Sequence, residues 1–96
     1  MINKKGMVMS KIIGEEHTNC MVVIKHESGC ETIERYYKKG STPWVFRKTG
    51  CIETDSRIYG AETEKPYISY LGQRWYLDDT RIKAMKTAMQ VNDTSD

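Results

Sequence analysis

The sequence predicts a small α+β domain, mainly an antiparallel β meander of about five to seven short strands with one C-terminal α-helix packed on the sheet. Its 96 residues leave room for a single core. Short apolar runs separated by Gly, Asn and Asp are typical of strands and tight turns. Apolar residues recur at helical spacing only near the C-terminus. We therefore assign residues 1–90 to one domain and expect 91–96 to be a disordered tail.

Residues 7–59 are predicted to form successive strands joined by turns. The predicted strands are 7–13, 20–26, 30–38, 44–48 and 51–54, with 57–59 continuing the last of them after an irregularity at 55–56. They are rich in β-branched and aromatic residues, which suit a pleated surface. The segments 15–19 and 39–43 are polar or contain Gly and Pro, so we expect turns or loops there.

The best-defined turn in this half is the segment 27–29 (ESG). It predicts a three-residue hairpin loop with Gly29 in the left-handed conformation, which glycine adopts without steric cost. This loop places Val22 opposite Glu34 on the return strand.

A second hairpin is predicted over residues 67–77, where two strand-like runs flank Gly72-Gln73. Glycine at the first central position is typical of a type II′ turn. Alternation places four apolar side chains on one face of this hairpin, and we expect that face to join the core: Ile68, Tyr70, Trp75 and Leu77. An acidic loop, 61–66, precedes the hairpin.

The segment 80–90 is predicted to be the helix. Asp78 and Asp79 come just before it, and acidic residues there cap the helix and interact favourably with its dipole. An apolar stripe at helical spacing is expected to pack on the sheet: Ile82, Met85, Ala88 and Met89. Because methionine adapts to irregular surfaces, a homodimer contact is the alternative use of this stripe.

Positive charge is concentrated in residues 35–48, RYYKKGSTPWVFRK. The chain has a net charge of +2, yet this stretch holds five cations and no acid, so the remainder is net negative. Four of its residues are aromatic. Cations bind phosphates while aromatic rings stack on unpaired bases, a combination typical of single-strand binders. The predicted binding residues are Arg35, Tyr36, Tyr37, Lys38, Lys39, Arg47 and Lys48.

Alternation along a strand sorts the aromatic residues of this stretch between core and surface. Trp44 and Phe46 share a face, and we expect both in the core, together with one of Tyr36 and Tyr37. The other tyrosine is expected to be exposed for stacking. We predict a non-catalytic binding module whose partner is nucleic acid or a nucleoprotein, bound without sequence specificity.

A helical alternative exists for residues 31–49. Ser28 and Glu31 form a capping-box pattern at the start of this segment. With two short helices here and residues 67–77 as a wing, the chain resembles the winged helix-turn-helix of small phage excisionases, in which a Gly-aromatic strand such as 72–75 (GQRW) is common. The resemblance implies binding of duplex DNA. The β-branched and aromatic residues within 31–49 favour strands, and the sheet is our main prediction.

Three cysteines are too few, and odd in number, for a disulfide framework. We expect free thiols in a cytoplasmic protein, with no secretory signal and no apolar segment long enough to span a membrane. Two His–Cys pairs, His17 with Cys20 and His26 with Cys30, have spacings that suggest zinc when taken singly. An extended strand separates the pairs by about 20 Å, so one site holding all four is not expected. His26, Cys30 and Cys51 could form a partial site if the chain folds back, but no metal or other cofactor is predicted.

Enzymatic chemistry has no clear candidate residues. Acidic pairs such as Glu15-Glu16 and Asp78-Asp79 fall in predicted loops or at the helix cap. The sequence holds no Gly-rich phosphate loop, HExxH motif or Ser/His/Asp spacing, and we predict no catalytic residues. The main alternative function is a stoichiometric protein inhibitor or adaptor of the phage or mobile-element type, for example an anti-defence protein. Such a protein would bind a host protein through 61–66 or 35–48.

Overall fold

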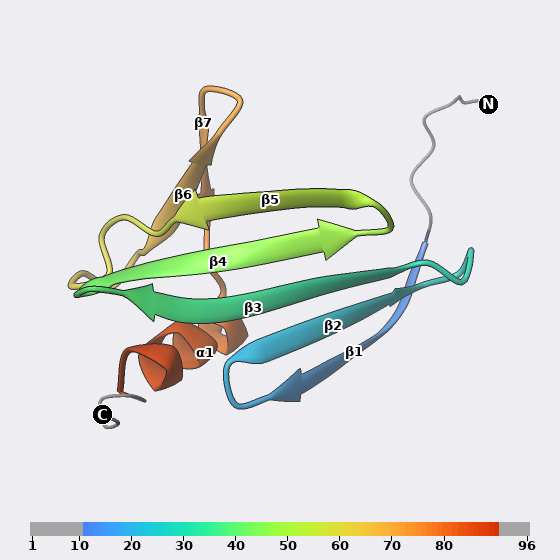
Figure 1. Ribbon diagram of the computed structural model, residues 1–96, viewed down its shortest axis with the longest axis horizontal. Coiled ribbons are helices and arrows are strands. Elements are labelled where there is room, and N and C mark those ends of the chain that lie inside the picture. Colours follow the sequence, from blue (N-terminus) through green and yellow to red (C-terminus); the bar gives the residue numbers. More distant parts are fainter. Residues whose placement is uncertain (1–10, 91–96) are drawn as a thin grey trace.

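A five-stranded antiparallel sheet, a two-stranded hairpin and one C-terminal helix make up the computed structural model, which describes residues 11–90 (Figure 1). The strands of the sheet, in both spatial and chain order, are β1 Ile12–Thr18, β2 Met21–His26, β3 Glu31–Lys39, β4 Thr42–Thr49 and β5 Ile52–Arg57. The hairpin consists of β6 Tyr67–Tyr70 and β7 Gln73–Tyr76, and the helix α1 is Asp79–Gln90. The predicted β meander with a C-terminal helix is confirmed.

Residues 31–49 are strands, so the winged-helix alternative is wrong. β3 and β4 pair without a break as far as Lys39 opposite Thr42. The two-residue turn between them is Gly40-Ser41, in which Gly40 has a φ of +65°. β-branched and aromatic residues lose side-chain freedom in a helix and pack well on a pleated sheet, which decides the outcome here.

Both predicted hairpins form, one as expected and one with a different turn. In the first, Gly29 has a φ of +95° and Val22 lies opposite Glu34, as predicted. In the second, the turn is Leu71-Gly72 with φ values of +54° and +75°, one residue earlier than predicted. Positive φ at both central residues is the mark of a type I′ turn. The register therefore differs by two residues, which preserves the face of every side chain.

The edge strands depart most from the prediction. The segment 15–19, predicted as a turn, belongs largely to β1, and the turn lies at Asn19, which has a φ of +42°. A strand at the edge with little covering it needs no apolar alternation, so its polar sequence concealed it. β5 runs without a break through 55–56. Residues 7–10 of the predicted first strand, and the predicted tail 91–96, lie outside the described residues.

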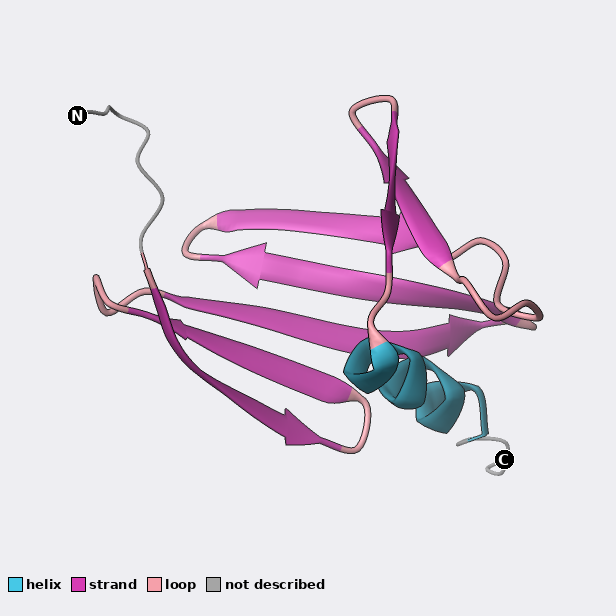
Figure 2. Ribbon diagram, turned by 180° about the vertical axis from the view of Figure 1, so that it is seen from behind, coloured by secondary structure: helices cyan, strands magenta, loops and turns pink. Residues whose placement is uncertain are grey.

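Both α1 and the β6–β7 hairpin lie on the same side of the sheet, in front of it in Figure 2. No described element covers the other side. The core lies between α1 and the sheet and consists of Val22, Ile24, Tyr36, Val45, Ile58, Ala84, Met85 and Ala88. Asp78 caps the helix as predicted, because its Oδ1 accepts a hydrogen bond from the Arg81 backbone N–H at 3.0 Å. Within residues 11–90, no helix is long and apolar enough to cross a membrane.

Candidate nucleic-acid interface

The side chains of β3 and β4 alternate between two faces of the sheet, and only one of these faces packs against α1. Tyr36 lies opposite Val45, and both are buried beneath α1. The neighbouring pair, Tyr37 opposite Trp44, points to the side that no described element covers. We call these two sides the covered face and the open face of the sheet.

Trp44 and Phe46 lie on the open face, so the prediction that they belong to the core is wrong. Both are half-buried. The smaller residues Pro43 and Val45 take the buried positions of β4 instead. The register set by the Gly40-Ser41 turn places Val45 opposite Tyr36 and Trp44 opposite Tyr37. The large size of Trp44 and Phe46 suggested that these two, and not Val45, belong to the core.

The predicted binding residues are divided between the two faces. Those on the open face are Arg35, Tyr37, Lys39 and Lys48, whereas Tyr36, Lys38 and Arg47 alternate to the covered side. As predicted, one of the two tyrosines enters the core: Tyr36 is 2 % exposed. It therefore offers no ring surface to a partner.

Arg47 belongs to an ion-pair network on the covered face. Its Nε lies 3.4 Å from Oε2 of Glu34, and Nε of Arg81 lies 2.9 Å from Oε1 of the same carboxylate. The Tyr36 hydroxyl donates to that Oε1 at 3.1 Å. Burial, followed by the charge of Glu34, raises the pKa of Tyr36 far above its ordinary value. A partner would have to compete with Glu34 for Arg47.

The predicted binding cations on the open face are held less tightly by acids. Nζ of Lys39 lies 4.0 Å from the ring centroid of Trp44, within the range of a cation–π interaction. Arg35 is exposed and makes no ion pair with the described residues. Nζ of Lys48 is 3.9 Å from Glu53, a long and exposed pair that contributes little. These cations remain accessible to an anionic partner.

Tyr37 is oriented by Asp55 on β5. Its hydroxyl donates to both carboxylate oxygens at 2.7 Å. Partial burial, together with this hydrogen bond, raises the pKa of Tyr37 to about 12. The hydrogen bond fixes the ring beside Trp44, while Asp55 keeps its negative charge. Glu53 and Asp55 mark the acidic border of this surface along β5.

The open face thus brings together three rings and three cations from residues 35–48. We call this set the open-face patch: Arg35, Tyr37, Lys39, Trp44, Phe46 and Lys48. Sequence reasoning assigned four of them to the site and placed Trp44 and Phe46 in the core. Register pairs Arg35 with Phe46 and Tyr37 with Trp44, so rings and cations lie side by side across β3 and β4.

The histidines and cysteines have other surroundings. Nε2 of His26 hydrogen-bonds to the Thr32 hydroxyl at 2.8 Å, and that hydroxyl meets Thr49 at 2.9 Å. All three cysteines are free thiols. Within the described part of the chain, no three His, Cys, Asp or Glu side chains are grouped so as to hold a metal ion.

The hairpin face predicted to be core is only half buried. Ile68 and Leu77 pack against the core, whereas Tyr70 and Trp75 are 48 % and 51 % exposed. They line a cavity of about 440 Å³ between the hairpin and the covered face, with exposed Ile52 at its rim. We call this cavity the hairpin groove. It is a second surface with apolar character, and the Glu34 network forms its polar end.

Comparison with family models, with curated proteins and with solved structures finds no match to this chain. The assignment of the site therefore rests on the geometry described above.

Proposed function

We propose that the protein is a non-catalytic binding module whose open-face patch binds single-stranded nucleic acid. The observation that carries the proposal is the position of Trp44, Phe46 and Tyr37 beside accessible cations on a sheet face that no described element covers. Aromatic rings on a sheet are the usual platform for unpaired bases, and neighbouring cations bind the phosphates.

Each part of the patch has a distinct role in this proposal. Trp44 and Phe46 stack on bases, and each stacked base contributes about 1–3 kcal/mol to binding. Arg35, Lys39 and Lys48 contact phosphates, which makes binding salt-dependent. A five-stranded sheet is too wide for the major groove, which admits a helix or a two-stranded ribbon, so a single strand is the expected substrate.

The cellular partner is then nucleic acid or a nucleoprotein, contacted without sequence specificity because stacking accepts every base. Cys20, Cys30 and Cys51 are all free thiols, which is typical of a reducing compartment. We accordingly place the protein in the cytoplasm as part of the proposal.

The test is a binding titration with labelled single-stranded and duplex oligonucleotides at two salt concentrations. Trp44→Ala should weaken single-strand binding by about 1–3 kcal/mol, roughly 5-fold to 150-fold. Arg35→Gln should weaken it less and reduce its salt dependence by about 0.7 in the log–log slope.

Arg47→Gln is the matched control, because it removes the same charge from the same stretch on the covered face. We expect it to leave single-strand binding within about twofold of the wild type. If the folded wild-type protein binds no oligonucleotide at low salt, the proposed function is wrong. Equal losses from Arg35→Gln and Arg47→Gln would also contradict it, because they would show that general charge and not the open face is responsible.

A protein partner is the second candidate function, and the hairpin groove is the observation that favours it. Trp75, Tyr70 and Ile52 expose apolar surface around one cavity. An inhibitor or adaptor would insert an apolar segment of its target there. Such a complex should survive high salt, whereas binding to phosphates should not. Trp75→Ala would disrupt the protein complex and leave binding to the open-face patch unchanged.

A further inference from the structure

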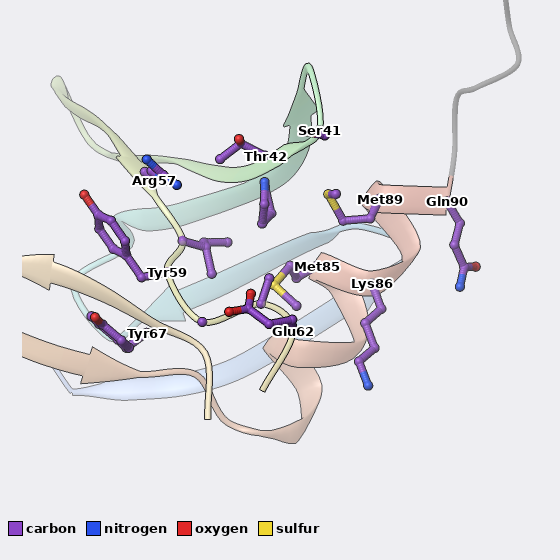
Figure 3. Close-up of a pocket in the computed structure, with 14 residues that line it drawn as sticks. Ser41, Thr42, Arg57, Tyr59, Glu62, Tyr67, Met85, Lys86, Met89 and Gln90 are labelled. Carbon is purple, nitrogen blue, oxygen red and sulfur yellow. The ribbon is translucent and has the colours of Figure 1, made fainter. Parts of the chain in front are cut away.

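A column of stacked side chains joins β5 to the hairpin. The guanidinium carbon of Arg57 lies 4.9 Å from the ring centroid of Tyr59. The Tyr59 ring stacks on Tyr67 with centroids 5.6 Å apart, and the guanidinium of Arg74 lies 4.4 Å from the centre of Tyr67. Figure 3 shows Arg57, Tyr59 and Tyr67 in succession along one wall of a cavity of about 750 Å³. We call these four residues the arginine–tyrosine column.

The backbone holds the centre of this column in place. Tyr59 and Tyr67 form an isolated antiparallel bridge, with reciprocal N–H···O hydrogen bonds of 2.8 and 2.9 Å. Tyr67 also lies opposite Tyr76 in the hairpin, and their ring centroids are 5.6 Å apart. The two arginines therefore rest on rings whose positions are fixed by main-chain pairing.

Strand register links the column to the open-face patch. Arg57 lies opposite Trp44 in the β4–β5 register, so the two side chains share the open face. Tyr59, two residues further along the chain, pairs with Tyr67 of the hairpin, and the cavity that these residues line is also lined by Met85 and Met89 of α1. Tyr59 and Tyr76 are 39 % and 56 % exposed.

Within residues 11–90, neither arginine of the column forms an ion pair, although Glu62 lines the same cavity as Arg57. Asp55, which is two residues from Arg57, accepts the Tyr37 hydroxyl instead. A guanidinium that stacks on a ring keeps its N–H groups at its edge, where they can bind a phosphate in bidentate fashion. Rings that fix the guanidinium lower the ordering cost of such binding.

We propose that the arginine–tyrosine column is a second phosphate-binding element, which extends the path of a single strand from the open-face patch onto the hairpin. The ligand is the phosphodiester backbone of the same nucleic acid, contacted by Arg57 and Arg74, while Tyr76 offers a ring to a base. This proposal rests on the proposed function. The complete site is then longer than the open-face patch alone, so a short oligonucleotide fills only part of it. Single-strand binding sites of this kind usually span roughly 4–16 nucleotides.

The experiment compares oligothymidylates of about five and about fifteen nucleotides, with oligouridylates as the RNA arm, for the wild type and Arg74→Gln. Arg74 is exposed on the hairpin, away from the open-face patch and the core. We expect Arg74→Gln to weaken binding of the long oligonucleotide severalfold and to lower its salt slope by about 0.7. Binding of the short oligonucleotide, held by the open-face patch, should stay within about twofold. Lys83→Gln on α1 is the control: it removes one positive charge away from both surfaces and should change the affinity for neither the long nor the short oligonucleotide.

The outcomes separate the two proposals. An unchanged long-oligonucleotide affinity and salt slope in Arg74→Gln would overturn the role of the column. Loss of short-oligonucleotide binding in Trp44→Ala would still support the proposed function in that case. A wild-type protein that binds neither length would overturn both. Arg74→Lys provides a check on geometry: it should keep most of the salt slope but lose affinity, because lysine cannot bind a phosphate in bidentate fashion. A lower Tm with unchanged binding would assign the column a structural role only.

Discussion

The covered and open faces of the sheet are built from the same strands but organise charge in different ways. On the covered face, Glu34 is surrounded by Arg81, Arg47 and the Tyr36 hydroxyl, so each buried charge has partners. On the open face, Lys39 lies over a ring and Arg35 has no acidic partner among the described residues. Burial explains the difference, because an unpaired charge is costly inside a protein and tolerated in water. The unpaired cations are therefore the ones left for an external anion.

The comparison predicts that large side chains on the two faces affect different measurements. Met85, which is 1 % exposed, should cost about 2–5 kcal/mol of the free energy of unfolding when changed to Ala, because a cavity remains. Trp44→Ala should cost at most about 1 kcal/mol, the value of a cross-strand pair. Chemical denaturation of both variants measures this. A stability loss for Trp44→Ala as large as that for Met85→Ala would show that the open face is covered in solution.

A smaller effect is expected from the charges. Glu34→Gln should destabilise the protein by about 1.5–3 kcal/mol, because hydrogen bonds between charged groups are lost. The Arg81 side chain is only 15 % exposed, so water cannot fully replace the lost partner. Glu53→Gln, its counterpart in the exposed pair with Lys48, should change stability by less than about 1 kcal/mol. Denaturation curves at one pH compare the two. Equal losses would contradict the distinction between the faces, as would a change in oligonucleotide affinity in Glu34→Gln.

The smallest predicted effect concerns Tyr37. Its pKa is raised to about 12 by partial burial and by the hydrogen bond to Asp55, so the neutral form is favoured in the folded state. The stabilisation is fully present below pH about 10, the ordinary tyrosine pKa, and is lost as the pH rises toward 12. NMR of ring-labelled tyrosine, with Tyr37→Phe to identify the signal, follows this titration. In Asp55→Asn, Tyr37 should ionise at lower pH, and an unchanged titration would show that Asp55 does not hold the hydroxyl.

Sequence reasoning succeeded where local rules decide the structure. The loop at 27–29 fixed the pairing of Val22 with Glu34, and the Asp78 cap fixed the start of α1. It failed where two local signals conflicted. The size of Trp44 suggested core, whereas the register from the Gly40-Ser41 turn places it on the open face. Register groups Trp44 with Tyr37 on one face, but the sequence does not say which face α1 covers. The prediction therefore relied on residue size and placed the large Trp44 side chain in the core.

The composition of the candidate site was only partly visible in the sequence. Residues 35–48 were recognised by their charge and aromatic content, but no spacing rule links them to Arg57 or Arg74. The arginine–tyrosine column depends on Tyr59 meeting Tyr67 across a loop of irregular structure. Contacts of that kind follow from the packing of the hairpin against the sheet.

By itself, the sequence determined that this protein is a β meander with a C-terminal helix and one basic–aromatic segment, because strand alternation, turn glycines and helix caps act over a few residues. Tertiary structure alone decided which side of the meander α1 and the hairpin cover. That choice buried Tyr36, paired Arg47 with Glu34 and left Trp44 and Arg35 on the open face. The reason is physical: a two-sided sheet presents two alternating sets of side chains, and only the layer packed against one set determines which of them meets water.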